Sequence, residues 1–595
     1  MDDWMAQNLH SLSEEDPVSL PYVHILLQTH SEQVSGNIAM SCSLLVPCPD
    51  RLMWESWRSS SFVTFSEHQE QRKQQVLRTY YLQVPSFAVG HDMYDYLHQF
   101  GDIKEVQLLP AVHDHNDAVS YLVEFATEAA ATEFFQSASL PAEQRAVPMK
   151  SRFLRWTPMG RKHGMFAQTQ TMQVLSQRKE KIPKQNHVSL SAEIQAYYEK
   201  VRLKDLDFRL SYLVCDQMEA ALRACVLPFG SSVNGFGKQD CDLDMFLSVA
   251  QMGPLSKVPE LTFLCKPGLT SARMQKQRYL ELLGDLLISL VPGCMQVQRI
   301  LRAKVPIVRF QHLFAKKDCD VSMDQVGPLM TELLWLLGEM DPRVRPLVFC
   351  IRKWAREVKV TSPVPGRWIS NFQLTLLVIH YLQVVRPVIL PSLRTLEALG
   401  GPDDIQVTSD GLECRYVRDL SIVTPSTNSS PVEDLLTGFF AYFHSFDFKH
   451  KGLSIRYAES VPKTYHQGVL YIENPLEPQL NASPNVVLEE VVRFQEQCRA
   501  ALWKLENVNR TLASLMEPLE VEELGYKPYG LVDVSKIFHE EEPKSTNSTN
   551  QLQPKPLLSA SARVPPSKMS SATSEPEPKK KASGKKSSVS NRIAT

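Results

Sequence analysis

The segment from Leu227 to Leu247, LPFGSSVNGFGKQDCDLDMFL, constrains this 595-residue chain more than any other. It ends in an apolar strand that carries Asp242 and Asp244. Because successive side chains on a strand alternate between its two faces, both carboxylates point the same way, while Leu243 and Met245 point into a core. Two carboxylates in one small space repel each other unless cations lie between them, and Mg²⁺ takes oxygen ligands of this kind. The strand therefore predicts a metal site.

A Gly-Ser turn, Gly230 and Ser231, precedes this strand. Glycine lets the backbone approach a phosphate closely, and the serine hydroxyl and amide can donate hydrogen bonds to the β- and γ-phosphates of a nucleotide. An isolated Asp-x-Asp pair is more often a solvated surface feature. Behind a Gly-Ser turn and between hydrophobic residues, the pair indicates a site for a nucleoside triphosphate and its metal ions.

The spacing between turn and carboxylates resembles that of the DNA polymerase β-like nucleotidyltransferase superfamily. Further along the chain, four blocks resemble, in order, the signatures of the family that carries a PAP-associated domain. The blocks are LVFCIRKWAREV, RWISNFQLTLLVIHYLQ, LLTGFFAYFHSFDF and IENPLEPQLNASPNV. The resemblance covers about residues 189–516. It implies an α+β fold, with a polymerase β-like palm domain followed by a mostly helical central and PAP-associated domain.

The resemblance also implies a third carboxylate on a neighbouring strand, and the segment KKDCDVSM offers Asp318 and Asp320. Both would point the same way from a strand. Asp320 is the better candidate because DVSM matches the acid-hydrophobic-small-hydrophobic strand of the family, which leaves Asp318 at the rim. Asp242, Asp244 and Asp320 are therefore the predicted catalytic residues and the predicted ligands of two Mg²⁺ or Mn²⁺ ions.

Residues around ATP follow from the same resemblance. Arg352 and Arg356 stand one helical turn apart, at positions where relatives hold lysines against the triphosphate. Asn371 stands where many relatives have a serine that touches the phosphates, and Phe372 stands where they have a tyrosine. Tyr416 is the candidate for stacking on the incoming base.

The predicted base choice depends on Leu480. Relatives that add uridylate place a histidine just before the asparagine of this block, whereas here Leu480 precedes Asn481. A histidine donor would favour a uracil carbonyl, while leucine removes that donor and suits a larger purine. The sequence therefore favours adenylation over uridylation.

The chain is predicted to divide into six regions. They are an irregular N-terminal segment (1–68), a degenerate RNA-recognition-motif-like α/β domain (69–150), a basic linker (151–188), the palm (189–330), the central helical and PAP-associated domain (331–516), and a C-terminal segment (517–595) with a disordered basic tail after about residue 540. Prolines interrupt the first region. The tail is rich in Ser, Pro and Lys and lacks the apolar residues that offset ordering entropy.

The second region follows a β-α-β-β-α order that resembles an RNA-recognition motif. Its expected elements are Thr79–Val84, Asp92–Phe100, Ile103–Leu109, Ser120–Ala126 and Glu128–Ser137. The two central-strand positions that should stack bases hold Ser120 and Leu122, so the usual RNA platform is mostly missing. Tyr81 and Phe125 could still stack a base, but an interaction role is favoured, and a homodimer contact is one such role.

Composition bears on how the chain attracts RNA and on whether it contains disulfides, a zinc site or a membrane span. Charged residues make up 22% of the chain and nearly cancel, to a net charge of −2, so attraction for RNA has to come from local basic surface. Eleven cysteines with no C-x-x-C pair argue against a disulfide framework and a structural zinc site. The most apolar stretch, 374–390, is interrupted by polar residues and Pro387, so it predicts a buried helix rather than a membrane span. The acidic N-terminus is unlike a mitochondrial presequence.

A degenerate RNA-recognition-motif-like domain before the catalytic core is a layout most similar to the mitochondrial members of the family. The resemblance implies a template-independent RNA 3′-adenylyltransferase that uses ATP and acts on mitochondrial transcripts. One metal ion, held by all three aspartates, would activate the RNA 3′-hydroxyl, and a second would neutralise the leaving pyrophosphate. The alternatives are a terminal RNA uridylyltransferase, a nuclear or cytoplasmic poly(A) polymerase, and an inactive RNA-binding scaffold.

Overall fold

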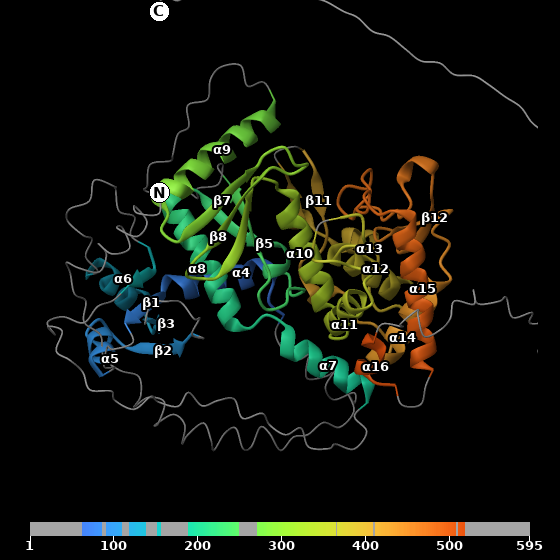
Figure 1. The fold of residues 1–595 in the computed structure, drawn as a ribbon, viewed down its shortest axis with the longest axis horizontal. Helices are drawn as coiled ribbons and strands as arrows, with labels where there is room; N and C mark the ends of the chain where they lie inside the picture. Colours follow the sequence, from blue (N-terminus) through green and yellow to red (C-terminus); the bar gives the residue numbers. More distant parts are fainter. Residues whose placement is uncertain are drawn as a thin grey trace, which may run out of the picture. The chain divides into compact units, whose positions relative to one another are not determined.

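The computed structural model describes residues 62–85, 91–109, 118–137, 151–155, 189–248, 271–364, 366–408, 411–506 and 510–517. Helices and sheets are both present, as the predicted α+β fold class requires (Figure 1). Most of the predicted irregular N-terminal segment, most of the basic linker and the basic tail lie outside the described residues. The domain boundaries given above stay predictions.

The first domain contains a four-stranded sheet in the order β2-β3-β1-β4. Its elements are β1 (Thr79–Pro85), α5 (His91–His98), β2 (Ile103–Leu108), β3 (Ala118–Phe125), α6 (Glu128–Ser137) and β4 (Phe153–Arg155). The five elements predicted here are present, with each end within two residues of its predicted position. Strand β4 falls inside the predicted basic linker, because three residues are too few to show an alternating pattern.

The palm is a five-stranded sheet in the order β5-β6-β9-β8-β7, in which β6 and β9 are parallel and the other pairs antiparallel. Its elements are α7 (Leu190–Val201), α8 (Asp205–Leu222), β5 (Cys225–Phe229), η1 (Gly230–Ser232), β6 (Leu243–Ser248), α9 (Ala272–Leu290), β7 (Cys294–Ile300), β8 (Ile307–His312) and β9 (Lys317–Ser322). Helices α8 and α9 pack on one face of this sheet (Figure 1), where Leu243, Met245, Cys319 and Val321 are buried. The residues that alternate with them project from the opposite face.

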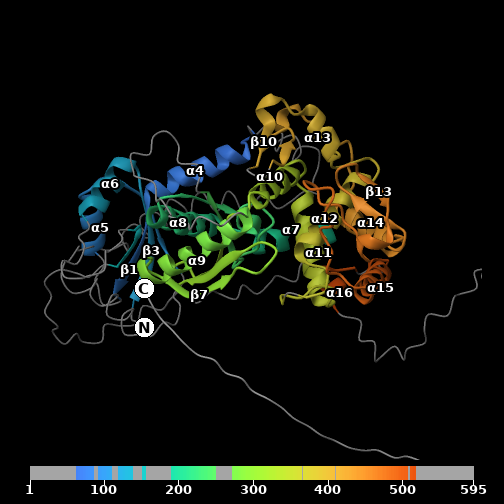
Figure 2. The same cartoon turned by 90° about the horizontal axis from the view of Figure 1, so that it is seen from above.

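The remaining core is mostly helical (Figure 2). Its elements are α10 (Val326–Glu339), α11 (Val344–Glu357), α12 (Asn371–Val384), α13 (Leu393–Leu399), η2 (Pro402–Asp404), β10 (Ile405–Val407), β11 (Glu413–Arg415), η3 (Leu420–Ile422), α14 (Val432–His444), β12 (Lys451–Ser454), β13 (Glu459–Pro462), η4 (Tyr465–Gln467), α15 (Leu488–Leu505) and α16 (Leu512–Met516). Helix α12 is buried along nearly its whole length, so the prediction of a buried helix there is confirmed. Within the described ranges, no helix is both long and apolar enough to cross a membrane.

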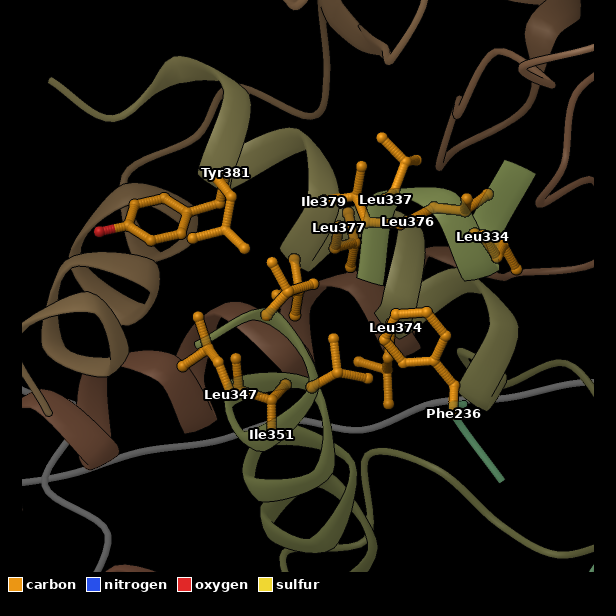
Figure 3. Packing of buried hydrophobic residues seen from close by; sticks show 14 of the residues in the cluster. Phe236, Leu334, Leu337, Leu347, Ile351, Leu374, Leu376, Leu377, Ile379 and Tyr381 are labelled. Carbon is orange, nitrogen blue, oxygen red and sulfur yellow. The ribbon is translucent and has the colours of Figure 1, made fainter. Parts of the chain in front are cut away.

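One aromatic residue joins the palm to this helical core. Phe236 follows the Gly-Ser turn and lies in the same buried cluster as Leu334 of α10, Leu347 of α11 and Leu374 of α12 (Figure 3). Its burial against three helices stabilises the loop between β5 and β6. The helical core therefore sets the position of the turn that precedes the paired aspartates.

The two aromatic residues considered for base stacking are both covered. Tyr81 is buried and packs against Phe153 of β4 and against Phe314, which lies between β8 and β9 of the palm. Phe125 is buried in the core of its own domain, where it packs against Phe134. Neither ring is open to a base, so the stacking considered from the sequence is wrong for both residues. The sheet face that carries Tyr81 contacts the palm instead.

A helix that the sequence pattern does not predict, α4 (Phe65–Leu77), begins inside the segment expected to be irregular. Thr64 and Glu67 form a capping box at its start. Phe65 packs on Trp335 of α10 at a ring separation of 5.4 Å. Only Phe65 and Val76 of this helix are buried, and two apolar positions are too few to produce a readable helical period.

Glu124 of β3 connects the first domain to the palm through charge. Its side chain is 0% exposed and accepts hydrogen bonds from Lys104 Nζ (2.7 Å) and Gln75 Nε2 (3.1 Å). Nη1 of Arg209, a buried arginine of α8, lies 3.3 Å from the same carboxylate. Arg209 also pairs with Glu105 at 2.6 Å, and that glutamate side chain is 43% exposed. The buried carboxylate of this network is therefore Glu124.

Replacing Glu124 with Gln removes the buried negative charge and leaves Arg209 and Lys104 facing a neutral side chain. We expect the free energy of unfolding to fall by about 2–4 kcal/mol, because the buried Arg209 is left with only the exposed carboxylates of Glu105 and Asp205. Chemical denaturation of the full chain measures this. Glu105→Gln is the matched control, since it removes one of the two exposed partners of the same arginine and should cost less than about 1 kcal/mol. Equal losses in the two variants would contradict the role given to Glu124.

Candidate active site

Asp244 and Asp320 lie side by side on the two parallel strands of the palm. The strand register pairs Asp244 of β6 with Asp320 of β9, and Asp320 with Arg309 of β8. Residues paired in this way project from the same face of a sheet. The row therefore lies on the face opposite α8 and α9. Asp242 is exposed and precedes the first residue of β6, two positions from Asp244. The structure thus places Asp244 and Asp320 side by side on two inner strands of the sheet, with Asp242 near enough for the charges of the three aspartates to act on one another.

Burial and mutual repulsion act on these carboxylates. The pKa of Asp244 is raised to about 7, first by burial and then by the charges of Asp320 and Asp242. The pKa of Asp242 is also raised, by partial desolvation of its carboxylate and by the charges of Asp318 and Asp320. The positive charge of Arg309 opposes both shifts. A divalent cation among these oxygens would relieve the repulsion.

The residues fit a divalent cation by their chemistry. Hard oxygen donors are what Mg²⁺ and Mn²⁺ prefer. Gly230 has φ +72°, and a Cβ atom on it would lie 2.3 Å from Asp244 Oδ2, so glycine keeps the space beside this carboxylate open. In the described part of the chain, no group of three or more His, Cys, Asp or Glu side chains converges as a metal site. Asp320 holds Arg309 instead, so its carboxylate has to turn for three aspartates to share one ion.

The Gly-Ser turn is held by α10. The backbone amide of Gly230 donates a hydrogen bond to the hydroxyl of Thr331 (2.7 Å), and this buried hydroxyl donates to the Gly327 carbonyl (2.8 Å). The half-buried Ser231 side chain hydrogen-bonds to Cys241, whose thiol pKa is raised by burial. Because Thr331 already takes the Gly230 amide, Ser231 is the residue of this turn that is better placed to meet a phosphate.

Residues 190–338 of this palm match the family model described as "Poly(A) RNA polymerase, mitochondrial-like, central palm domain". The mitochondrial poly(A) RNA polymerase of Drosophila melanogaster is 36% identical over 452 residues, which cover 72% of this chain and 73% of that relative. The chain belongs to the mitochondrial poly(A) RNA polymerase family. The resemblance stated from the sequence blocks is therefore confirmed, and this chain is a nucleotidyltransferase by family.

Two further comparisons extend this result. A crystal structure of mtPAP in complex with ATPγS has a TM-score of 0.64 at 32% identity, covering 77% of this chain and 100% of that chain. Similarly matching mtPAP structures are complexes with UTP, GTP and CTP. The speckle targeted PIP5K1A-regulated poly(A) polymerase of Danio rerio is 30% identical over 301 residues, which cover 47% of this chain and 37% of that relative.

Arg352 and Arg356, which are predicted to contact the triphosphate in this chain, have different surroundings. Arg352 donates hydrogen bonds to the Phe236 carbonyl (2.5 Å), to the Asn371 carbonyl (3.1 Å) and to the Thr375 hydroxyl. Burial lowers its pKa to about 10. Arg356 is exposed in the last turn of α11, and its side chain forms no ion pair with any residue described here. Arg352 therefore holds the fold together, whereas Arg356 is open to a ligand.

Asn371 and Phe372 open helix α12. Ser370 caps this helix by accepting a hydrogen bond from the Gln373 amide. The Asn371 side chain is exposed, while its carbonyl accepts from Arg352. Phe372 is half-buried against the helical core. A helix N-terminus suits a phosphate group, and the contact of Asn371 with the phosphates stays a prediction.

Tyr416 has surroundings that contradict its predicted stacking on a base. It is 1% exposed, and its hydroxyl lies 3.2 Å from both the Leu329 carbonyl and the Glu332 carboxylate. The guanidinium of Arg418 lies 4.9 Å from the centre of its ring. Tyr416 is thus a core residue that joins its segment to α10. The surrounding sequence, RYVR, mixes apolar and basic residues, so it does not indicate that Tyr416 is buried.

Leu480 is half-buried in a turn. Its amide donates to the Glu477 carbonyl (2.8 Å), and its carbonyl accepts from the Asn474 amide (3.0 Å). The next residue, Asn481, donates from its side chain to the carbonyls of Gln467 and Leu470 and so secures the turn. The backbone of Leu480 is therefore structural, and the effect of its side chain on base choice stays a prediction.

Two functional residues were not predicted from the sequence. Arg309 belongs to the carboxylate row, and Thr331 positions the Gly-Ser turn. The segments VPIVRF and KKDCDVSM form two antiparallel strands joined by a short turn. Interpreting them as a hairpin would have paired Arg309 with Asp320. Thr331 offers no such signal, because a threonine inside an apolar helix usually bonds only to its own helix.

The raised pKa of Asp244 predicts a pH-dependent stability. An unfolded aspartate titrates near 3.9, so at Asp244 the ionised form destabilises the fold. That cost is fully present above about pH 7, shrinks as the pH falls and is absent below about pH 4. We therefore expect Asp244→Asn to stabilise the metal-free protein by about 1–3 kcal/mol at pH 8 and by clearly less at pH 5. Thermal unfolding in chelator at both pH values measures this. The same gain at both would contradict the electrostatic account.

The contrast between Arg352 and Arg356 also predicts different outcomes. Arg352→Met removes a charged donor from three acceptors and should lower the unfolding free energy by about 2–3 kcal/mol. Arg356→Met should change stability by less than about 0.5 kcal/mol and should raise the KM for ATP. Thermal unfolding and steady-state kinetics on both variants make the comparison. A stable Arg352→Met protein with a selectively raised KM would show instead that Arg352 turns toward the triphosphate.

Proposed function

We propose that this chain is a template-independent poly(A) polymerase that transfers AMP from ATP to RNA 3′ ends, with mitochondrial transcripts as its substrates. The observation that carries the proposal is the pairing of Asp244 with Asp320, beside Asp242 and behind the Gly-Ser turn. Family membership supports it, because relatives covering most of the chain are named mitochondrial poly(A) RNA polymerases. The partial match to a speckle targeted enzyme keeps a nuclear location as the alternative.

Asp242, Asp244 and Asp320 would hold Mg²⁺ or Mn²⁺ ions, which supply the Lewis acid that activates the RNA 3′-hydroxyl and screens the pyrophosphate. Ser231 would hold a phosphate oxygen, and Arg356 would meet the charge of the triphosphate. Asn371 would orient the phosphates at the start of α12. The 3′-oxygen forms a bond to the α-phosphorus as the bond to pyrophosphate breaks. The reaction needs no covalent enzyme intermediate.

Base choice is assigned to the pocket rather than to a template. Leu480 lacks a hydrogen-bond donor for a uracil carbonyl, which supports adenylation. Similar mtPAP structures are complexes with ATPγS, UTP, GTP or CTP, so a bound nucleotide alone does not identify the base that is added. Turnover with each nucleotide is therefore the measurement that decides.

The RNA-recognition-motif-like domain is assigned an interaction role. Its sheet face is taken up by the palm, as Tyr81 and Phe314 show. Strand β2 lies at the edge of the sheet with Leu108 exposed, and an exposed edge strand can pair with a second chain. This edge supports the predicted homodimer.

Extension of a short labelled RNA with each nucleoside triphosphate in turn tests the proposed function. We expect ATP to give the longest products, and Asp242→Asn, Asp244→Asn and Asp320→Asn to reduce extension to background while RNA binding persists. Asp318→Asn is the matched control, since Asp318 is an exposed aspartate on the same strand as Asp320. It should retain most of the activity.

Two other outcomes would overturn the proposal. Preferred extension with UTP would make the chain a uridylyltransferase. Binding of RNA without extension by any nucleotide would make it a scaffold. The mutual repulsion of the three carboxylates argues against the scaffold, because such repulsion has no use in a protein that binds no metal.

A further inference from the structure

Arg309 forms a two-point ion pair with the third carboxylate of the site. Its Nε lies 2.8 Å from Asp320 Oδ1, and its Nη2 lies 2.6 Å from Asp320 Oδ2. Both oxygens of Asp320 are therefore engaged by one guanidinium. This parallel arrangement is the strongest geometry available to an arginine and a carboxylate.

The same charge acts on the other two aspartates. Arg309 is the nearest cross-strand partner of Asp320, which is in turn paired with Asp244. It is a favourable charge for both Asp242 and Asp244. A guanidinium at this end of the row therefore does part of the work that a divalent cation would do, since it offsets repulsion among the three carboxylates.

A metal ion and Arg309 cannot both make full use of Asp320. An ion bridging the three aspartates has to take an oxygen that already accepts a hydrogen bond from the guanidinium. The two cations would also repel each other at such close range. The Arg309 side chain is 45% exposed, against 15% for Asp320, so the arginine is the partner that can turn into solvent without loss of core packing.

We propose that Arg309 is an internal counter-cation that occupies Asp320 in the metal-free protein, and that the bridging metal ion has to displace it. The inference rests on the proposed role of the three aspartates as metal ligands. It has a consequence for the order of assembly. The bridging ion binds weakly to the enzyme alone and gains affinity once a triphosphate and an RNA 3′-oxygen add their own ligands. Arg309 thereby couples metal occupancy to the presence of substrate.

The opposite role for Arg309 predicts an effect of opposite sign. If the arginine held Asp320 ready for the metal, its removal would weaken metal binding. If it competes for Asp320, its removal strengthens metal binding. The sign of the change in metal affinity therefore separates a competitor from a positioning residue.

Titration of the full chain with Mn²⁺, without ATP or RNA and followed by electron paramagnetic resonance, tests the inference. We expect Arg309→Met to bind Mn²⁺ about 3- to 30-fold more tightly at the site that includes Asp320. This factor corresponds to the free energy of one charge-assisted bidentate ion pair. Arg309→Lys keeps the charge without the fork and should give an intermediate affinity. If Arg309→Met folds and its Mn²⁺ affinity is unchanged or weaker, the inference is overturned. If Arg309→Met does not fold, an Mn²⁺ affinity of Arg309→Lys equal to that of the wild type overturns it.

Two further variants complete the experiment. Arg299→Met is the matched control, since Arg299 lies on β7, pairs with Asp285 of α9 and is directed to the other face of the sheet. It should bind Mn²⁺ as the wild type does. If this variant bound Mn²⁺ more tightly by the same factor as Arg309→Met, the change in net charge alone would explain the effect. Asp320→Asn should weaken Mn²⁺ binding. If Asp320→Asn binds Mn²⁺ as tightly as the wild type, the metal ligands assigned in the proposed function are wrong. If Asp320→Asn binds Mn²⁺ more weakly but Arg309→Met does not bind it more tightly, only the role of Arg309 is overturned.

Discussion

Repulsion among carboxylates on one sheet face is the constraint on which the rest of this structure depends. Asp244 and Asp320 face each other across parallel strands, and burial makes the charge of Asp244 costly. A fold keeps such an arrangement only where a cation offsets it. In the protein alone that cation is Arg309. On the proposed function, a divalent metal ion takes this role in the working enzyme.

Both layers of the core support this row. On one face of the palm, Leu243, Cys319 and their neighbours pack under α8 and α9 and fix the strands that carry the aspartates. On the other side, Thr331 holds the amide of Gly230, and Arg352 ties the Phe236 loop to the start of α12. The helical core therefore positions the Gly-Ser turn, which is proposed to hold the nucleotide phosphates. On that proposal, we expect core substitutions near this turn to change nucleotide binding without touching a ligand.

Sequence reasoning succeeded where the pattern of a single strand is sufficient. Alternation predicted that Leu243 and Met245 point into the core, and both are buried there. The choice of Asp320 over Asp318 as a metal ligand stays a prediction. Sequence reasoning did not identify Arg309, because that role depends on the register between β8 and β9. Tyr416 was misjudged because a tyrosine between basic residues looks exposed, although it is buried against α10.

The most direct measurement of the central claim is a crystal structure with Mn²⁺, a non-hydrolysable ATP analogue and a short RNA, with anomalous scattering used to locate the metal. The account predicts an Mn²⁺ peak bound by Asp242, Asp244 and Asp320, with the Arg309 guanidinium turned away from Asp320. An Mn²⁺ peak elsewhere, with the pair between Arg309 and Asp320 intact, would contradict it.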